Sequence, residues 1–556
     1  MQRDTTKQYY ALHSWVGVVT AVMLFVIAFT GAVSVFSRGE LKVWANQDIR
    51  SYTDHDFVAI ENLIRDHAAA VAPAFYDHVQ VFFPGPHGGR ALSIIFEDEV
   101  VTQAGGHTHR AIWFRHHPQT LALLSRQEGD LNQLFAQSDS DMADFLVTFH
   151  ADLHLGSPLG LILTGLLGLT LLASVITGIL IHPKILKELF NFRPWRSMRL
   201  LFTDTHKVLG VWGLLFHGTI GFTGAILGLV TVVLIPAAAF VSFNGDQEKL
   251  LETFLPEVEP ALTGQPAEPQ LASTLQEFSE KNPGVIVGNV VIYGWGDKGS
   301  VMTVSTLGDR LNARTYEYST ATGELIRDYT LFSRLDGSVK VVLDAMYPLH
   351  FGNFGGIAVK FIWFFLGLST ALLAATGMMV WIERRAYGAE GKLSLTTYNR
   401  ISKFTAGVCG GLIVATLSLF HAQLLLPMMA NTIGFWLGVV FFGVWVACGI
   451  GAMLRPNAYL ATRDLMLLAA ITALLVIPVN GVVTGDWIIN SLLSGDFIVA
   501  GVDAFVLATG ALLAWSAFNL PAQRPVRQKS SQQESRHAPV ASDPDAEVTG
   551  LTGDCS

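Results

Sequence analysis

The sequence predicts an α-helical membrane bundle of about eight transmembrane helices, with a core of four helices from a tandem duplication and two α+β modules outside the membrane. Three observations support this fold class. Hydrophobic residues make up 51% of the 556 residues and charged residues only 15%, whereas an ordinary globular domain carries roughly 25% charge. Apolar runs long enough to cross a bilayer recur along the chain. Two histidine-containing motifs also occur twice, in the same order.

A bilayer span needs about 20 mostly apolar residues. The runs that meet this length are 13–36, 157–181, 207–241, 355–382, 403–426, 432–454, 464–485 and 497–519. We expect the third run to tilt or break near Pro236, and polar residues such as Asn480 and Asp503 interrupt the last two. The first run is longer than the apolar region of a signal peptide and has no small-residue cleavage site after it, so it is predicted to be a retained anchor.

The short loops indicate the orientation of the spans. Lysine and arginine gather in loops 182–206, 383–403 and 455–463, whereas loops 427–431 and 486–496 contain neither residue. Because short loops rich in Lys and Arg stay in the cytoplasm, these three loops and both termini are predicted to be cytoplasmic. The two long polar segments then lie outside.

Each long polar segment has a helical stretch followed by alternating, strand-like runs. The helical stretches are IENLIRDHAAAVAPAF and QLASTLQEFSEKNPG, and the strands include HVQVFF, ALSIIFE and NVVIYGWG. The predicted division of the chain is 1–36 (N-terminus and first span), 37–150 (outer module), 151–242 (spans two and three), 243–348 (second outer module), 349–385 (fourth span), 386–520 (four additional spans) and 521–556 (disordered cytoplasmic tail).

Several chemistries have little support. The net charge is −9 and the basic residues lie in loops between spans, so nucleic acid is not an expected partner. Of the three cysteines, Cys409 and Cys448 lie inside apolar runs and Cys555 in the tail, which gives no disulfide framework or thiolate metal site. The chain has no HExxH, GxSxG or Walker motif, which disfavours hydrolase and nucleotide chemistry.

An internal repeat covers the first 385 residues. His13 and His206 each precede an FTGA sequence, and in both copies the histidine is 16 residues before its phenylalanine. The sequence LH-x-G occurs at Leu153–Gly156 and at Leu349–Gly352, each followed by a Thr-Gly pair about one membrane thickness later. Two copies inserted in the same orientation are related by an axis along the membrane normal, so equivalent residues face each other.

The repeat therefore predicts two facing histidine pairs. His13 and His206 would meet at the cytoplasmic ends of their helices, and His154 and His350 at the outer ends. Polar side chains near a bilayer usually need a partner or a cofactor, and neutral imidazole is a good axial ligand for haem iron. We therefore expect two b-type haems. Glycines beside these helices would give the flat macrocycle clearance, although they also serve ordinary helix packing.

Other histidines leave alternatives open. His217 lies on the same helix face as His206 at mid-depth, but its counterpart in the repeat is Leu24, so it could bind haem, relay electrons or protons, or hydrogen-bond in the core. His150 lies one turn before His154, and either could be the outer ligand, with the LH-x-G match favouring His154. His182 and His421 are interpreted as interface residues.

The first outer module is rich in histidine. Its histidines are His55, His67, His78, His87, His107, His109, His116 and His117. If residues 107–109 form a strand, His107 and His109 share a face and could bind a metal, although a solvated surface is favoured. Trp113, Tyr293 and Trp295 could contact a ligand, but aromatic residues at strand spacing more often form core.

The motifs LHSWVG, LHLGSPLG, THKVLGVWG and PLHFG, together with the two FTGA sequences, resemble those of the PepSY-associated transmembrane proteins. The resemblance covers roughly residues 8–386 and implies PepSY-like periplasmic modules in a bacterial inner-membrane protein. It further implies a haem-containing siderophore reductase of the ferrioxamine-linked type, with ligand roles on His13, His206, His154 and His350. The PepSY module is also associated with peptidase inhibition and regulation.

The first hypothesis is a transmembrane oxidoreductase that passes electrons from a cytoplasmic-side donor to a periplasmic ferric siderophore, expected to be of the hydroxamate type, and releases ferrous iron. No dinucleotide fingerprint occurs, so a separate flavin or quinol donor is required. The siderophore is expected to dock between the two outer modules. Two alternatives are a non-enzymatic regulator or binding protein anchored by the bundle, and a siderophore or haem permease.

Overall fold

A computed structural model describes residues 3–46, 55–84, 91–101, 107–136, 141–182, 190, 192–193, 197–256, 258–307, 314–387, 391–426 and 433–523. Within these ranges, eight helices are long and apolar enough to cross a membrane, and they fall on the eight predicted runs. The predicted tail from residue 524 onward, the loop 427–431 and residues 183–189, 191 and 194–196 of loop 182–206 lie outside the described residues.

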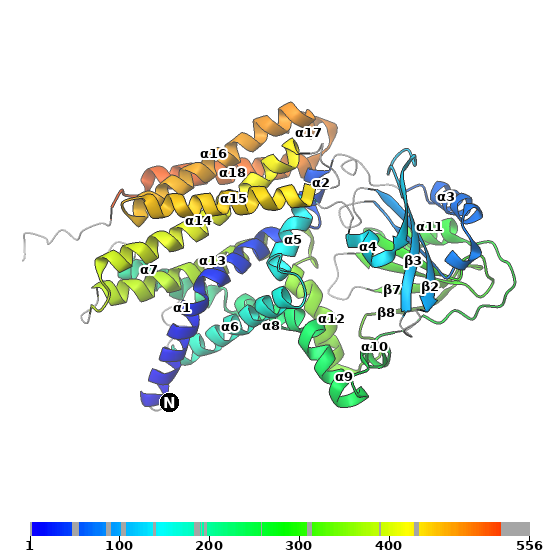
Figure 1. Cartoon of the computed structure of the whole chain (residues 1–556), viewed down its shortest axis with the longest axis horizontal. Coiled ribbons are helices and arrows are strands. Elements are labelled where there is room, and N and C mark those ends of the chain that lie inside the picture. Colours follow the sequence, from blue (N-terminus) through cyan, green and yellow to red (C-terminus); the bar gives the residue numbers. More distant parts are fainter. Residues whose placement is uncertain are drawn as a thin grey trace, which may run out of the picture.

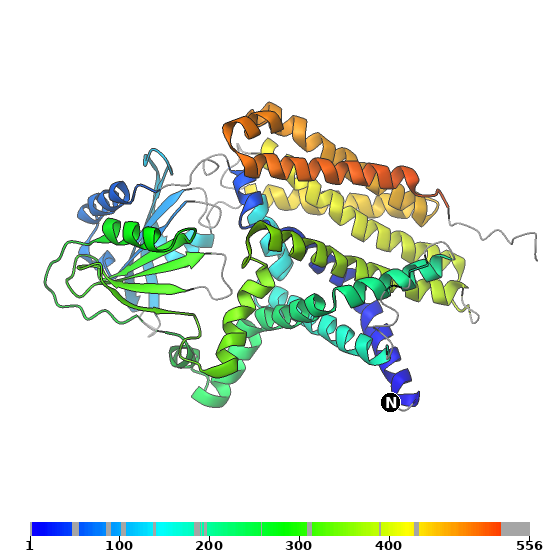
Figure 2. The same cartoon turned by 180° about the vertical axis from the view of Figure 1, so that it is seen from behind.

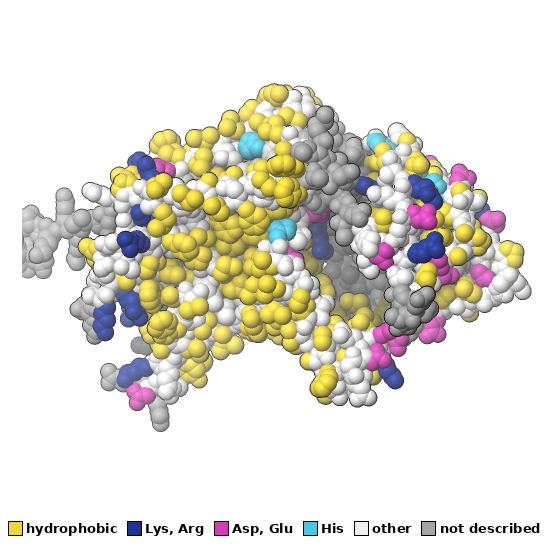
Figure 3. Space-filling model, viewed as in Figure 1, with side chains coloured by type: hydrophobic (Ala, Val, Ile, Leu, Met, Phe, Trp, Pro, Cys, Tyr) yellow, Lys and Arg dark blue, Asp and Glu magenta, His cyan; other side chains and the backbone are white. Residues whose placement is uncertain are grey.

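The molecule has two parts, a helical bundle and a sheet domain that lies beyond one end of it (Figures 1 and 2). We call this end of the bundle the sheet end and the other the far end. On the face seen in Figure 3, apolar side chains cover the bundle, Lys and Arg gather at its far end, and the sheet domain carries both acidic and basic side chains. Arg385 at the far end stacks its guanidinium 4.5 Å from the ring centre of Trp381. Cations and tryptophans in this arrangement are typical of a membrane boundary.

The four core spans are α1 (Arg3–Ser34), α6 (Leu159–Ile181), the third span and α13 (Gly356–Tyr387). The third span is divided, as expected, into α7 (Met198–Trp212), α8 (Leu214–Leu229), a π-helical turn (Val230–Leu234) and α9 (Ile235–Phe243). Pro236 sits in the first turn of α9. Because proline lacks an N–H and its ring clashes with the carbonyl four residues earlier, the regular hydrogen bonds are interrupted just before it.

Glycines bring α6 and α8 into close contact. A Cβ atom added to Gly228 would lie 2.6 Å from the backbone nitrogen of Gly165, and one added to Gly168 would lie 2.5 Å from that of Ala225. Any larger side chain would therefore push the two helices apart. Gly165, Gly168 and Gly228 therefore serve close helix packing.

The strands of both outer segments form one antiparallel sheet in the order β4-β3-β2-β1-β5-β6-β7-β8. The strands are β1 (His78–Phe82), β2 (Leu92–Val101), β3 (His107–His116), β4 (Leu123–Asp130), β5 (Ile286–Tyr293), β6 (Val301–Leu307), β7 (Thr315–Ser319) and β8 (Leu325–Tyr329). The first strand of each segment pairs with the other at the centre, with Val79 opposite Ile292. The order is thus symmetric about the β1–β5 pair, as a duplication predicts.

This pairing corrects one expectation. A siderophore was expected to dock between two separate modules, but β1 and β5 are hydrogen-bonded neighbours and leave no gap there. Helices α3 (Phe57–Ala70) and α11 (Leu271–Lys281) cover the sheet face that points away from the bundle, and α4 (Leu131–Ala136) lies on the face toward it (Figure 1). The apolar side chains of α3 and α11, such as Ile64 and Leu275, are fully buried against the sheet.

Short helices connect the two parts of the molecule. They are α2 (Glu40–Ala45), α5 (Met142–Asp152), α10 (Gln247–Phe254) and α12 (Gly337–Phe351). Asp141 caps α5 by accepting hydrogen bonds from two backbone N–H groups, and Asp144 completes a capping box. The Lys42 ammonium lies 3.1 Å from Asp141 and 2.5 Å from Asp144. Burial alone would lower the pKa of Lys42, but the two carboxylates outweigh it and raise that pKa.

The additional spans α14 (Leu395–Leu425), α15 (Ile433–Leu454), α16 (Ala458–Thr484) and α18 (Phe497–Asn519), with the short α17 (Ile488–Ser494), form a layer against the core. Two buried polar residues of these spans, Asn480 and Asp503, form hydrogen bonds at the contact between this layer and α2. Asp503 accepts hydrogen bonds from the Trp44 indole at 2.8 Å and from the Asn480 amide at 3.1 Å, so a fully buried carboxylate ties α18 to α2 and α16. Polar atoms in a membrane bundle are tolerated when they are paired in this way.

The central β1–β5 pairing can be tested by cross-linking. Gln80 and Val291 are direct partners in the register, and residues directly opposite in antiparallel strands have Cβ atoms roughly 5 Å apart, within reach of a disulfide. We expect the variant carrying Gln80→Cys and Val291→Cys to form an intramolecular disulfide, seen as protection from a maleimide mass tag. In the control, Gln80→Cys is combined with Thr303→Cys, which lies one strand farther away opposite Val291. Equal cross-linking of both variants would contradict a single sheet in this order.

Candidate functional site

Two histidines face each other near the far end of the core, as the repeat predicts. The ring centres of His13 and His206 are 6.2 Å apart, with 76° between the ring planes. His13 projects from α1, and its Nδ1 lies 3.1 Å from the Ser174 carbonyl oxygen and 3.1 Å from Thr177 Oγ1, both on α6. The helix that carries the histidine is therefore joined to a neighbouring span through the ring.

His206 repeats this arrangement on the other side. Its Nδ1 lies 3.0 Å from the Leu373 carbonyl oxygen and 3.3 Å from Thr376 Oγ1, both on α13. In each case the carbonyl belongs to the residue three positions before the threonine. The two halves of this pair are thus related by the duplication down to individual hydrogen bonds.

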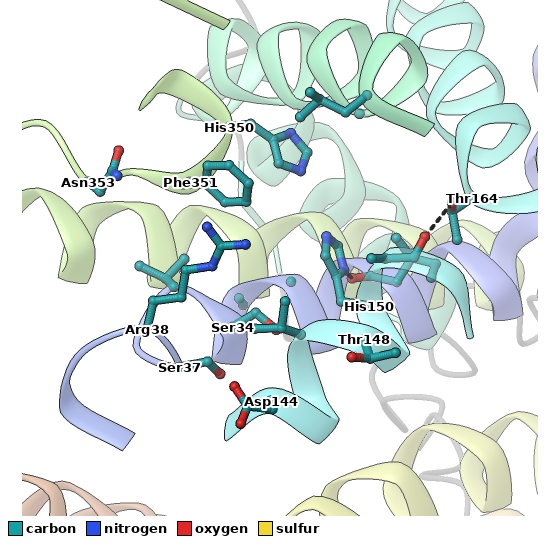
Figure 4. A pocket seen from close by; sticks show the side chains of 18 of the residues that line it. Ser34, Ser37, Arg38, Asp144, Thr148, His150, Thr164, His350, Phe351 and Asn353 are labelled. Atoms are coloured by element: carbon teal, nitrogen blue, oxygen red, sulfur yellow. Dashed lines mark hydrogen bonds between the residues drawn. The ribbon is translucent and has the colours of Figure 1, made fainter. Parts of the chain in front are cut away.

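A second pair lies near the sheet end and consists of His150 and His350. Their ring centres are 6.1 Å apart, with 29° between the planes. His150 projects from the last turn of α5 and its Nδ1 lies 3.0 Å from the Ile27 carbonyl oxygen on α1. His350 projects from the last turn of α12, and its Nδ1 lies 2.9 Å from Thr223 Oγ1 on α8. Figure 4 shows both imidazoles pointing into one cavity.

The prediction that His154 faces His350 is wrong in this structure, and His150 takes that place. Helix α5 ends at Asp152, the capping residue Leu153 has a left-handed φ of 58°, and His154 follows with a φ of 54°. The chain therefore reverses just before His154 and carries its ring to the opposite side of α5. There the ring packs 4.2 Å from that of Phe145, at the contact with α15.

Each of the four rings lies against a Thr-Gly pair of a neighbouring helix. A Cβ added to the glycine would lie close to the imidazole Cε1 in every case: 2.6 Å for Gly31 and His150, 3.3 Å for Gly224 and His350, 3.6 Å for Gly178 and His13, and 3.1 Å for Gly377 and His206. The Thr-Gly pairs of the repeat were visible in the sequence, but their contacts with the histidine rings were not predicted. The signal was that each copy contains two Thr-Gly pairs, one for each of its two paired histidines.

The hydrogen bonds fix the protonation of these rings. A backbone carbonyl can only accept, so Nδ1 of His13, His206 and His150 carries the proton. Thr223 donates its hydroxyl hydrogen to the Thr219 carbonyl at 2.8 Å, so His350 also donates from Nδ1. Among the described residues no hydrogen bond engages Nε2 of these four rings. Each pair therefore presents two Nε2 lone pairs, the form in which histidine binds metals.

Each pair lines a cavity. The cavity at the sheet end has a volume of about 720 Å³ and the one at the far end about 990 Å³, both within the general range of roughly 300–1,000 Å³ for cofactor pockets. Leu24, Leu171 and Thr370 line both cavities. A layer about one side chain thick thus separates two spaces that together run through the core.

Cations lie around both cavities. At the sheet end the Arg38 guanidinium is 4.8 Å from the ring centre of Phe351, next to His350 (Figure 4). Arg115 of the sheet lines the same cavity. At the far end the cavity is lined by Arg199, Lys207, Arg384, Arg385 and Lys392. Each cavity can therefore receive a flat, largely apolar group with anionic substituents, the apolar part between the helices and the anions beside these cations.

His217 is fully buried and does not belong to either pair. Its Nδ1 lies 2.9 Å from Thr370 Oγ1 and its Nε2 lies 3.1 Å from the Leu209 carbonyl oxygen. Both ring nitrogens are occupied, so the suggestion that His217 binds haem is not supported by this geometry. Of the three roles left open for His217, the structure shows hydrogen bonding within the core. One of its partners, Thr370, lines both cavities.

The remaining candidates lie elsewhere. His421 was expected at the membrane interface. In the structure its Nε2 lies 2.9 Å from the Thr472 carbonyl oxygen, a contact between α14 and α16. His182 ends α6 and lines the cavity at the far end. Trp113 and Trp295 are buried in the sheet domain, Trp295 in its apolar core and Trp113 against α4. His87 and the side chain of His107 lie outside the described residues, although the predicted strand at 107–109 is present.

Comparison with known proteins identifies the family of this chain. Residues 10–384 match the family model described as the PepSY-associated TM region. The chain belongs to this family. An uncharacterized protein of Pseudomonas aeruginosa is 27% identical over 390 residues, which cover 67% of this chain and 94% of that protein. The matched region contains both histidine pairs and the whole sheet, while the four additional spans lie beyond it.

Proposed function

We propose that this protein is a haem-containing membrane oxidoreductase that passes electrons from a donor at the far end of the bundle to a ferric siderophore at the sheet end. One observation carries the proposal. A pair of imidazoles with engaged Nδ1 and available Nε2 lies at each end of the same four-helix core. The family membership is consistent with this assignment, and the relative's printed name assigns no activity.

The spacing of the rings supports haem as the ligand. Two imidazole nitrogens that each lie about 2.0–2.1 Å from one metal ion between them would put their ring centres roughly 6.3 Å apart. The measured separations are 6.2 Å and 6.1 Å. His13 and His206 would hold one haem b, and His150 and His350 the other. Arg38 is placed to pair with a propionate at the sheet end.

Haem iron held by two imidazoles accepts and releases one electron at a time. The chain's own residues supply the rest of the path. The four Nδ1 hydrogen bonds fix the rings, and Leu24, Leu171 and Thr370 keep the two sites apart by a thin layer that excludes water. The far-end cavity opens among basic residues, where a separate quinol or flavin donor would approach. One electron reduces one ferric ion to the ferrous state.

The substrate would approach the cavity at the sheet end. This cavity is lined both by the bundle and by the bundle-facing side of the sheet, including Ser93, Trp113 and Arg115. A ferric hydroxamate siderophore would therefore dock between the sheet and the bundle. Its hard oxygen donors hold ferric iron more tightly than ferrous iron, so reduction favours release of the metal. The permease and regulator alternatives make no use of the paired Nε2 atoms.

The distribution of charge supports one orientation. The cations at the far end would face the cytoplasm, and the sheet domain the periplasm of a bacterial inner membrane. Both termini of the described bundle, at α1 and α18, begin or end at the far end (Figure 1). Electrons would then move outward, toward iron that arrives from outside the cell.

The haem assignment is tested by the spectra of histidine variants. We expect the purified full chain to show b-type bands after reduction with dithionite. His13→Ala and His150→Ala should each lower the haem content by about half, because each removes one ligand from a different pair. His154→Ala is the matched control, four residues along the same segment, and should keep the full haem content. The assignment fails if the folded, haem-supplied protein lacks b-type bands, or if His154→Ala loses haem and His150→Ala does not.

A second prediction concerns the glycines that lie against the histidine rings. Gly31→Leu would place a side chain where the His150 ring lies, since even a Cβ there is 2.6 Å from Cε1. We expect loss of the haem at the sheet end, with the other haem retained. Gly218→Leu in the core helix α8 is the control, because nothing lies within 4 Å of its added Cβ and Gly218 lines neither cavity. The measurement is haem stoichiometry per chain. Equal loss in both variants would indicate a general effect on the helical core instead.

The direction of electron transfer can be measured in sealed vesicles. We expect vesicles with trapped reductant to produce ferrous iron from an external ferric hydroxamate, detected with a ferrous chelator. His206→Ala should lower the rate about 10- to 100-fold, and His421→Ala should leave it unchanged. Uptake of the intact ferric complex without reductant would favour the permease, and an absence of both activities in haem-replete vesicles would favour the regulator.

A further inference from the structure

Three potential metal ligands meet on the sheet, away from the histidine pairs. They are His78 on β1, Glu97 on β2 and His109 on β3. The Glu97 Oε2 atom lies 3.9 Å from Nδ1 of His78 and 3.7 Å from Nδ1 of His109. The two imidazole rings are nearly parallel, with centres 6.4 Å apart and 24° between the planes. All three ligand atoms lie within 4.8 Å of one another.

The strand register places these side chains on one face. His78 is directly opposite Glu97 in the β1–β2 pair, and His109 is opposite Glu99, two residues farther along β2. Because side chains alternate between the two faces of a strand, residues 97 and 99 share a face, and so do their partners. This is the bundle-facing side, since Phe96 on the other face is buried in the core beneath α3 and α11.

The charge of Glu97 is the feature that most needs an explanation. Its side chain is only 3% exposed. Within the described part of the chain its ion-pair partners are His78 and His109, and its other oxygen accepts a hydrogen bond from the Gln80 amide. Nδ1 of His109 is buried and has no hydrogen-bond partner there. A buried carboxylate without a compensating cation is costly, and an imidazole nitrogen aimed at it without a hydrogen bond offers a second ligand.

We propose that His78, Glu97 and His109 bind one divalent first-row transition cation. Two ligands at about 2.1 Å from a common ion lie roughly 3.0–3.4 Å apart at octahedral or tetrahedral angles. The separations of 3.7 Å and 3.9 Å reach this value by small side-chain rotations. Two imidazoles and a carboxylate suit Zn²⁺ or Fe²⁺ and leave open positions for water or a substrate atom. The Gln80 amide orients the carboxylate, as ligand-supporting groups commonly do.

The site shares a face with the cavity at the sheet end. Ser93 lines that cavity and lies four residues before Glu97 on β2, which corresponds to about 13 Å along a strand. If the proposed function holds, the ferrous product would be released within reach of this site. The binding of a divalent cation by these three side chains does not depend on that function.

The test measures zinc bound by the full chain in detergent, after treatment with a chelator. We expect the wild type to retain about one more equivalent of Zn²⁺ per chain than Glu97→Gln or His109→Ala, because each variant removes one of three ligands. Glu128→Gln is the matched control, since it removes a half-exposed carboxylate of β4 that pairs with Arg126 and not with the cluster. It should bind as the wild type does.

Two further measurements distinguish loss of the metal site from loss of folding. Haem content should be the same in all four proteins, which separates loss of the metal site from loss of folding and from failure of the proposed function. His78→Ala, at the exposed edge of the cluster, should also lose the equivalent. Equal zinc binding by the wild type and by the Glu97 and His109 variants, with haem or thermal unfolding unchanged, overturns the proposal and leaves the cluster as an ion pair.

Discussion

The hydrogen bond from each paired histidine to a neighbouring helix is the constraint on which the core depends. It needs an acceptor oxygen, either the hydroxyl of a threonine directly before a glycine or the carbonyl four residues before it, and the glycine leaves room for the ring. His206, for example, reaches the Leu373 carbonyl only because Gly377 leaves room beside Cε1. A side chain in place of that glycine would separate α7 from α13. The same contact sets the helix spacing and the direction of Nε2.

The additional spans hold α5, the helix that carries His150, in place. This helix has His150 on one side, and on the other side Phe145 and Phe149 pack against Phe441 of α15, with ring centres 5.2 Å and 5.0 Å apart. Its first turn is held by Gln423 of α14, which accepts the Met142 N–H at 2.9 Å. A short helix lacks the length to be stable alone. The layer formed by α14 and α15 therefore supports the helix that positions one of the four rings.

The sequence predicted the features that depend on local pattern. The eight spans follow from apolar length, and the pair formed by His13 and His206 follows from the repeat, because both histidines occupy equivalent positions in equivalent helices. Two features were not accessible in this way. The choice of His150 over His154 depends on a left-handed turn at Leu153, a residue that rarely adopts it. The joining of β1 to β5 depends on pairing between residues more than 200 positions apart, which no local pattern specifies.

The distance between the two pairs explains why the core contains two sites and a thin partition. His13 and Ile27, whose carbonyl holds His150, are 14 residues apart on α1, or about 21 Å along the helix. A single site could not connect both ends of such a span. Two flat groups that extend toward each other from the pairs would leave only the layer of Leu24, Leu171 and Thr370 between them. His217 is hydrogen-bonded to Thr370 at this layer and to the Leu209 carbonyl oxygen, so its buried ring joins α8 to α13 and α7 between the two cavities.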